Sequence, residues 1–272
     1  RYLFPAAAAA DDEAKATDDD ASAERGLFDN AKAALLSISD ADFSWPATDT
    51  PALAGVDLAV FPGELVGVVG AVGSGKSALL GAAAGGRLVR AKGAVVVDAA
   101  AAVAPQKPFV ASATVRANVT LGRPLDRAKY DACVDACGLR EDFDGWRPAG
   151  DLTEVGERGV TLSGGQKARV SLCRALYAEA PLLIADDPLS ALDVRVGARV
   201  FERVLRAYPS KERGRAVLLA LNQMHHATAC DRVVVVEHGR IVESGPPSEL
   251  RAAGGAFARL AAAAPAPGAD VD

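Results

Sequence analysis

The chain has 272 residues, a net charge of −5 and 50% hydrophobic residues, enough for a sizeable core in one large domain or two small ones. This acidic balance gives no broad attraction for nucleic acid, so we expect no nucleic-acid partner. The four cysteines are too few and too unevenly spaced for a disulfide scaffold, and no His or second Cys pair completes a metal set.

Both ends of the chain are predicted to be linkers. Residues 1–34 hold an alanine tract and two acidic runs, and such a stretch cannot bury enough apolar surface to order itself. Residues 263–272 are rich in Ala and Pro. No apolar run reaches the roughly 18–20 residues of a membrane helix. Because the chain starts at Arg1 without a signal peptide, we expect a piece of a longer protein whose folded domain spans 35–262.

Three strands are predicted before the first glycine-rich motif. Apolar residues alternate from Leu36 to Trp45, and Val56–Val60 forms a second strand-like run. These two segments are expected to form an antiparallel flap. Glu64–Val69 is short, apolar and β-branched, as in a buried parallel strand.

A P-loop pattern follows this third strand. Gly70–Ser77 fits G-x-x-x-x-G-K-[ST] without a mismatch, and helix-forming residues continue to Ala84. Backbone N–H groups and the helix dipole would bind a phosphate, with Lys76 at the β- and γ-phosphates and Ser77 offering a hydroxyl to Mg²⁺. The alternative is a chance glycine-rich turn, which the flanking strand and helix disfavour. The motif residues expected to bind ATP are Gly70, Ala71, Val72, Gly73, Ser74, Gly75, Lys76, Ser77 and Ala78.

The remaining elements alternate between strands and helices, which predicts an α/β domain with a mainly parallel sheet. The predicted strands are Gly93–Val97, Ala101–Ala104, Pro181–Asp186 and Ala216–Leu221, with two edge-like strands at Arg232–Glu237 and Arg240–Val242. The predicted helices are Thr114–Val119, Asp126–Cys137 with Asp126 as N-cap, Gly164–Ala178, Val194–Tyr208 and Ser248–Leu260.

Two further segments carry chemistry. Asp186 ends an apolar strand, so its carboxylate would lie beside the P-loop and hold Mg²⁺ through water next to Ser77. A second glycine-rich helix start lies too far along the fold to serve the P-loop of the same chain. Its residues are Leu162, Ser163, Gly164, Gly165 and Gln166.

On these motifs, residues 35–262 resemble the nucleotide-binding domain of an ATP-binding-cassette (ABC) transporter. The resemblance implies a P-loop NTPase fold with a mainly parallel core sheet, an antiparallel β flap and a helical signature subdomain at about 107–178. It implies ATP and Mg²⁺ as cofactors and a head-to-tail dimer in which each ATP lies between one domain's P-loop and the other domain's Leu162–Gln166 equivalent. The partners would be a second such domain on the same polypeptide and the coupling helices of a transmembrane domain. This chain would lie on the cytosolic face of the membrane.

Finer features resemble the first nucleotide-binding domain of the C subfamily, the multidrug-resistance-associated organic-anion exporters. The matching segments are Asp42–Trp45, Thr153–Gly159 and Asp186–Ser190.

Roles for single residues follow from that resemblance. Trp45 would stack on adenine, for which an aromatic face is suited, although an ordinary core aromatic is the alternative. Gln106 would contact Mg²⁺ and sense the transmembrane domain. Residues Glu154–Gly159 would face the coupling helices, and Asp193 would cross the dimer interface.

Two residues depart from the pattern of hydrolytically competent domains. Asp187 stands where those domains have a Glu that activates water. A carboxylate withdrawn by more than ~1 Å can cost ~10²-fold in rate, and this change is typical of the C-subfamily first domain. Asn222 stands where a His contacts the γ-phosphate, and an amide cannot take up a proton. A loop shift that brings His225 to this place is the alternative. We therefore expect a domain that binds Mg-ATP, hydrolyses it weakly, and lends its intact second motif to a partner's ATP.

Three functions remain in view. The leading hypothesis is one half of an asymmetric ATPase that drives a membrane exporter. The alternative is a non-transporting, nucleotide-gated regulatory or channel module. A soluble ABC ATPase acting on DNA or ribosomes is disfavoured because no heptad run lies between Lys76 and Leu162 and the linkers are not basic. A generic P-loop kinase would not explain Leu162–Gln166.

Overall fold

The structure is a computed structural model that describes residues 34–46, 50–86, 88–156 and 160–264. Nearly all of the predicted linkers, 1–34 and 263–272, lies outside the described residues. The same holds for Glu157–Gly159, the second half of the segment expected to face the coupling helices.

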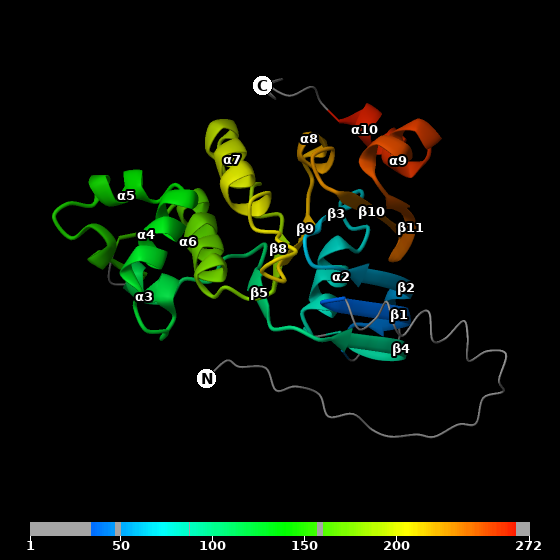
Figure 1. The fold of residues 1–272 in the computed structure, drawn as a ribbon, viewed down its shortest axis with the longest axis horizontal. Coiled ribbons are helices and arrows are strands. Elements are labelled where there is room, and N and C mark those ends of the chain that lie inside the picture. The colour runs from blue at the N-terminus through cyan, green and yellow to red at the C-terminus, as the bar shows by residue number, and fades with distance from the viewer. Residues whose placement is uncertain (1–33, 47–49, 87, 157–159, 265–272) are drawn as a thin grey trace. The chain divides into compact units, whose positions relative to one another are not determined.

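A six-stranded sheet forms the centre of the domain, in the order β11-β10-β3-β9-β8-β5. Five of these strands run parallel, and β11 pairs with β10 in the antiparallel direction. The predicted mainly parallel core sheet is therefore confirmed (Figure 1). The strands are β3 (Leu65–Val69), β5 (Ala101–Ala104), β8 (Leu182–Asp186), β9 (Ala216–Ala220), β10 (Arg232–Glu237) and β11 (Arg240–Gly245).

The inner strands β3, β8, β9 and β10 are apolar along nearly their whole length rather than at alternate positions, as in strands that are covered on both faces. In β3, Leu65 and Val69 face one hydrophobic core, and Val66 and Val68 face the other. The same alternation runs through β8, β9 and β10. The first core packs against the helices that follow β5, and the second packs against α2 (Lys76–Ala83) and an antiparallel sheet.

The antiparallel sheet contains the predicted flap and one strand more. Its order is β2-β1-β4, with β1 at Leu36–Ser44, β2 at Pro51–Val60 and β4 at Val89–Val97. The predicted strand Gly93–Val97 is thus the second half of β4. Figure 1 shows this sheet beside α2, at the opposite end of the domain from α3, α4 and α5.

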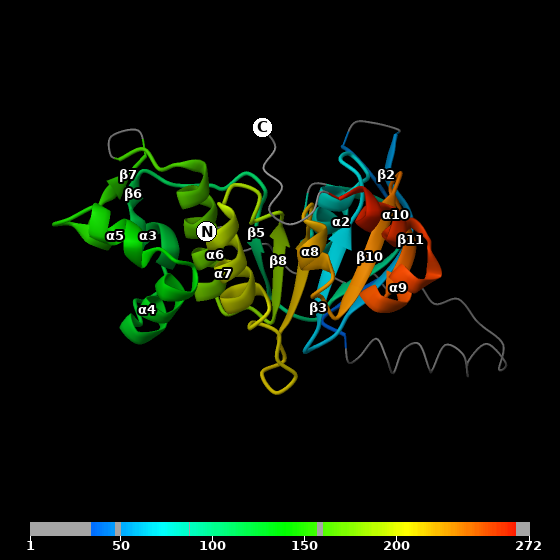
Figure 2. The ribbon, with the colours of Figure 1, turned by 90° about the horizontal axis from the view of Figure 1, so that it is seen from above.

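The segment between β5 and β8 is mostly helical, and Figures 1 and 2 both show it as a separate group around α6. Three of its helices begin at side-chain caps: Thr114 accepts from Ala117 N–H, Asp126 accepts from Lys129 N–H, which confirms the predicted N-cap, and Ser163 accepts from Gln166 N–H. The elements are β6 (Ala113–Thr114), α3 (Val115–Thr120), α4 (Arg127–Ala136), α5 (Arg140–Gly145), the 3₁₀ turn η1 (Gly150–Leu152), β7 (Glu154–Val155) and α6 (Gly164–Tyr177).

Two details of the C-terminal half correct the sequence prediction. The strand Arg232–Glu237 is not edge-like: β10 lies between β3 and β11, so of the two strands predicted at an edge only β11 is at one. The single helix predicted at Ser248–Leu260 is two helices, α9 (Pro247–Ala253) and α10 (Ala256–Ala263). Gly254 and Gly255 separate them, since glycine is a poor helix former.

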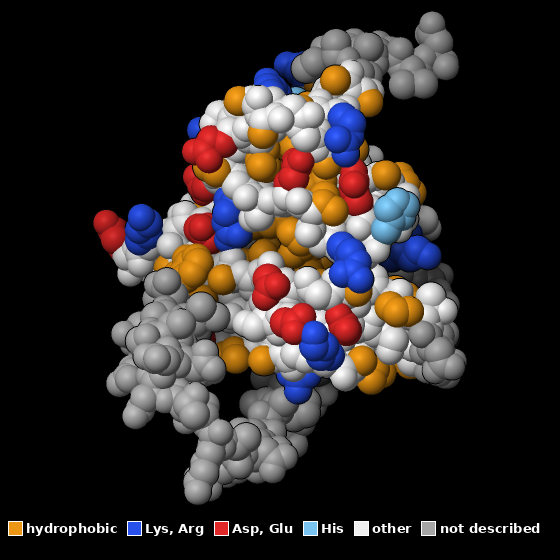
Figure 3. Space-filling view, turned by 90° about the vertical axis from the view of Figure 1, so that its right-hand side faces the viewer, with side chains coloured by type: hydrophobic (Ala, Val, Ile, Leu, Met, Phe, Trp, Pro, Cys, Tyr) orange, Lys and Arg blue, Asp and Glu red, His pale blue; other side chains and the backbone are white. Residues whose placement is uncertain are grey.

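The remaining helices lie between these strands. The predicted helix from Val194 is α7 (Val194–Val200), which continues as the π-helical segment η2 (Phe201–Leu205), and the short α8 (Met224–Ala227) follows β9. On the face drawn in Figure 3, basic and acidic side chains are interspersed with apolar ones. Within the described part of the chain, no helix is both long and apolar enough to cross a bilayer.

Candidate functional site

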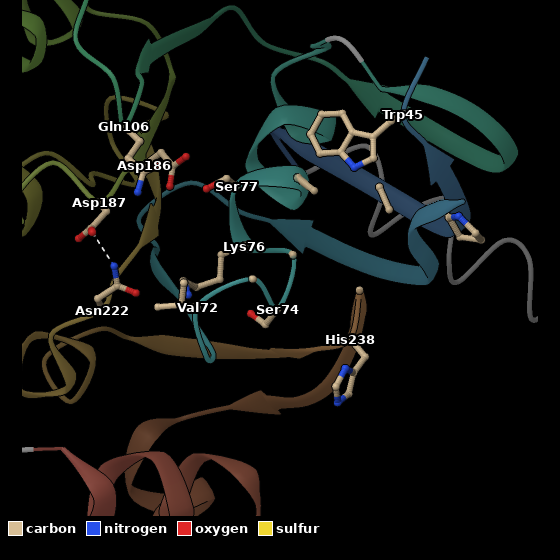
Figure 4. Close-up of a pocket in the computed structure, with 16 residues that line it drawn as sticks. Trp45, Val72, Ser74, Lys76, Ser77, Gln106, Asp186, Asp187, Asn222 and His238 are labelled. Carbon is tan, nitrogen blue, oxygen red and sulfur yellow. Dashed lines mark hydrogen bonds between the residues drawn. The ribbon is translucent and has the colours of Figure 1, made fainter. Parts of the chain in front are cut away.

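A cavity of about 520 Å³ opens where the P-loop meets the carboxyl ends of β8 and β9. This is the edge at which ligands bind in open parallel sheets. Figure 4 shows the residues around it, which come from the start of β2 and from the ends of β1, β3, β5, β8, β9 and β10 or the segments that follow them. The predicted site residues that line the cavity are Trp45, Val72, Gly73, Ser74, Gly75, Lys76, Ser77, Ala78, Gln106, Asp186, Asp187 and Asn222.

The P-loop curls around its own lysine. Lys76 Nζ donates to the carbonyl oxygens of Gly70 (2.7 Å) and Ala71 (3.0 Å). These two residues hold the lysine side chain in place, and they do not line the cavity. Burial lowers the pKa of Lys76, and the nearby carboxylates of Asp187 and Asp186 partly oppose this effect. The ammonium group is therefore held at the floor of a cavity in which an anion would stabilise its charge.

The turn between β10 and β11 is hydrogen-bonded to the P-loop. Gly239 N donates to Ser74 O (2.8 Å), and Ala54 N donates to Gly239 O (2.9 Å). His238 and Gly239 line the cavity, as does Ala52. Sequence reasoning missed these residues: the His-Gly pair signalled a hairpin turn, but nothing in the sequence placed that turn beside the P-loop.

Asp186, Ser77 and Gln106 form an oxygen-rich wall of the cavity (Figure 4). Burial raises the pKa of Asp186, a hydrogen bond from the Ser77 hydroxyl opposes this rise, and the charge of Asp187 adds to it. No group of three or more His, Cys, Asp or Glu side chains that could hold a metal occurs among the described residues. A cation here would therefore be held by a mixed set of carboxylate, hydroxyl and amide oxygens.

Asp187 and Asn222 contact each other directly. They follow the adjacent parallel strands β8 and β9, and Asp187 N still donates to Ala220 O (3.1 Å) as a continuation of that pairing. Asn222 Nδ2 donates to Asp187 Oδ2 at 2.6 Å (Figure 4). Asp187 Oδ1 is buried without a hydrogen-bond partner in the described structure, and burial raises the pKa of this carboxyl group. The predicted alternative residue, His225, does not line the cavity.

Trp45 borders the cavity on the side of the antiparallel sheet. Its side chain lies across the cavity from Asp187 and Asn222 in Figure 4. With 49% of its surface exposed, Trp45 is not an ordinary core aromatic. It lines the same cavity as Ser77 and Ala78.

The signature segment, which we define as Leu162–Gln166, does not reach this cavity. Leu162 is buried, and Ser163 and Gln166 form a capping box at the start of α6. Asp193 is also remote from the cavity: its carboxylate accepts from Val196 N (2.9 Å) and caps α7. The P-loop group thus lines one cavity, and the signature segment and Asp193 are absent from its lining. Gly164 instead lines a smaller pocket that Gln106 and Asp187 also border.

Comparisons with known proteins agree on one family. The family model described as "ABC transporter" matches residues 53–190. ABC transporter C family member 13 from Oryza sativa subsp. indica is 38% identical over 230 residues, which are 84% of this chain and 15% of the relative.

Two mouse relatives are similar to the same extent. ATP-binding cassette sub-family C member 2 from Mus musculus is 38% identical over 232 residues, 85% of this chain and 15% of the relative. Sub-family C member 4 from the same species is 38% identical over 229 residues, 84% of this chain and 17% of the relative. The chain therefore spans only about a sixth of the length of these relatives.

Proposed function

The chain belongs to the ABC transporter family, and from that premise we propose that it is an ATP-binding domain of a C-subfamily membrane exporter. It binds Mg-ATP in the cavity around the P-loop and acts in a head-to-tail pair with a second nucleotide-binding domain on the same polypeptide. Binding and hydrolysis of ATP in that pair drive transport by a transmembrane domain, with this domain on the cytosolic face of the membrane.

One observation carries the nucleotide-binding part of the proposal. Lys76, Ser77, Asp186 and Gln106 come from three different parts of the sequence, and all line the same cavity with the P-loop backbone. Backbone N–H groups and a buried ammonium are suited to phosphate oxygens. The exposed ring of Trp45 at the opposite side suits a base, so the cavity has a phosphate end and an aromatic end.

The oxygen wall fits Mg²⁺, which takes hard oxygen ligands and keeps several of its waters. Ser77 and Asp186 would hold the ion, and Gln106 would complete the set. The raised pKa of Asp186 supports this reading, because a buried carboxylate is stabilised by a cation. The ion would neutralise charge on the phosphates. The chain's own residues bind and orient the nucleotide beside it.

The contact between Asp187 and Asn222 supports weak hydrolysis at this site. An attacking water needs a carboxylate that is free to accept from it. Here one oxygen of Asp187 already accepts from an amide at 2.6 Å and the other is buried, and the Asn222 amide neither takes up nor gives up a proton near neutral pH. We infer that this domain holds ATP for long periods and hydrolyses it slowly.

The position of the signature segment supports a second domain as partner. Because Leu162–Gln166 lies outside the chain's own cavity, its helix N-terminus is available to the ATP of another domain. Asp193 would cross the same interface. Glu154, at the edge of the helical group, would face the coupling helices of the transmembrane domain.

Nucleotide binding and single-turnover hydrolysis by the chain test this proposal together. We expect Mg-ATP to bind, and the Lys76→Ala variant to bind at least ~10-fold more weakly, because the lysine to phosphate contact is charge-assisted. Lys129→Ala, which removes a lysine from α4 that pairs with Glu179, is the matched control and should bind normally.

Hydrolysis by the native chain should be ~10²-fold slower than that of a domain with Glu and His at 187 and 222. Hydrolysis at the rate of such a domain would contradict the weak-site proposal.

The same slow site favours a second candidate, a nucleotide-gated regulatory or channel module without transport. A long-lived ATP held beside the Asp187 to Asn222 hydrogen bond would be sufficient to keep two domains together. ATP-dependent substrate uptake into vesicles by the full-length protein distinguishes the two functions. Uptake supports the exporter, and ATP-dependent gating without uptake supports the module.

A further inference from the structure

Gln166 connects the signature segment to a helix that precedes it in the sequence. Its side-chain oxygen accepts from Ser163 N (2.9 Å), and its Nε2 donates to Asp142 Oδ1 of α5 (3.0 Å). Ser163 Oγ in turn accepts from Gln166 N (3.2 Å). The amide thus bridges the first turn of α6 and a carboxylate on another element.

Asp142 is held in place by Arg169, one turn further along α6. Arg169 Nη1 lies 2.9 Å from Asp142 Oδ2, and Nη2 donates to Oδ1 (3.2 Å). Arg169 Nη1 also donates to Gly138 O (2.5 Å), in the turn between α4 and α5. The side chains of Asp142 and Arg169 are only 11% and 13% exposed, so water screens this ion pair little.

This arrangement determines which way the Gln166 amide faces. An ionised carboxylate only accepts hydrogen bonds, so Asp142 can meet the NH₂ group of Gln166 and not its oxygen. The oxygen is then directed to Ser163 N–H, and the first turn of the signature helix has one hydrogen-bonded arrangement. By contrast, the neighbouring pair of Asp135 and Arg140 is 54% and 44% exposed, and the second hydrogen bond of Arg140 goes to Asp131 of α4.

We propose that Asp142 and Arg169 are positioning residues for the ATP bound by the partner domain. They hold Gln166 and Ser163 in the geometry that meets the partner's phosphates, and they act through Gln166 rather than by contacting nucleotide. The inference rests on the proposed function, in which the signature segment completes a partner's site.

The experiment measures Mg-ATP-dependent association of the chain by sedimentation velocity, with ATP binding to the dilute monomer as a separate readout. Asp142→Asn should weaken association by about tenfold, because it removes a charge-assisted acceptor. It should leave monomer binding unchanged, because the P-loop cavity is elsewhere. Asp135→Asn, the same substitution in an exposed ion pair of the same subdomain, should change association less than about twofold.

A double-mutant cycle identifies the route of action. In a Gln166→Ala background, Asp142→Asn should weaken association no further, because the group through which it acts is gone. An equal loss in both backgrounds, or no loss in either, would overturn the inference. If melting curves show that Asp142→Asn does not fold, Arg169→Lys, which keeps the charge and loses the planar fork, is expected to give the same tenfold loss. Absence of ATP-dependent association of the native chain, both with itself and with the second nucleotide-binding domain of the full-length protein, would overturn the head-to-tail pair of the proposed function, and this inference with it.

Discussion

At the scale of single residues, Asp187 combines backbone strain with the burial of a charged group. It adopts a left-handed backbone conformation (φ 48°), which Asp and Asn tolerate better than other non-glycine residues. Its side chain is buried, and Asn222 satisfies only one carboxylate oxygen. Burial therefore outweighs the favourable hydrogen bond, and the pKa of Asp187 is raised. The ionised form destabilises the ligand-free domain.

This leads to a prediction for Asp187→Asn. An amide fits the same backbone conformation, still accepts from Asn222 and carries no charge, so the variant should be more stable at neutral pH by on the order of 1 kcal/mol. Because the folded pKa of Asp187 lies above its unfolded value, the gain should be full above the folded pKa and vanish below the unfolded value of 3.8. Urea unfolding at several pH values measures it. Asp144→Asn, in an exposed ion pair, is the control, and a gain that persists in acid would contradict the explanation.

Residues within one motif could be predicted from the sequence, and contacts between motifs could not. The P-loop pattern alone predicted where Lys76 and Ser77 would lie. The hydrogen bond between Asp187 and Asn222 joins residues 35 positions apart, and it depends on β8 and β9 being neighbours. Gly239 was missed for the same reason, since its partner Ser74 lies on a distant loop.

At the scale of elements, the sequence predicted whether a segment is a helix or a strand better than it predicted how that segment is exposed. The apolar run of β10 indicated a strand, but edge or interior is decided by which strands pair with it. Here β10 pairs with β3 on one side and with β11 on the other. The break between α9 and α10 was visible as Gly254-Gly255, yet the helical pattern continued across it. Local propensity therefore sets the elements, and tertiary pairing sets their exposure.

The turn from β3 into the P-loop gives a prediction at this scale. A Cβ at Gly70 would run into the Val236 carbonyl oxygen and the Ser74 side chain, whereas a Cβ at Gly73 would meet no atom within 4 Å. Both glycines have positive φ values, so Gly73→Ala should cost about 1 kcal/mol of unfolding free energy from backbone strain alone. Gly70→Ala adds a steric clash with backbone and should cost about 3 kcal/mol. Chemical denaturation compares the two variants, and equal losses would contradict the tight approach of β10 to the P-loop.

At the scale of the whole molecule, the proposed function gives one chain two half-sites. The P-loop cavity has no residue of the signature segment in its lining, and Gly164 at the start of α6 is exposed. The family resemblance predicted this separation from the order of motifs, but the sequence alone could not show that both halves are accessible. If the halves belong to complementary sites, they must meet between two such domains, and two copies of this chain can supply them.

Mixing two variants tests that arrangement. Lys76→Ala removes the phosphate-binding ammonium and keeps the signature segment. Gly164→Asp keeps the P-loop and puts a negative charge at the signature helix. An added Cβ there is 3.9 Å from its nearest neighbour, and an acid in the first helical turn does not oppose folding. Each variant alone should fail to associate with Mg-ATP, because every site would contain one damaged half. A mixture can form one site from two intact halves, so association should return in the mixture only, seen as energy transfer between chains carrying different fluorophores. Association of either variant alone at the native level, or none in the mixture, would show that the signature segment does not complete a site in the other chain.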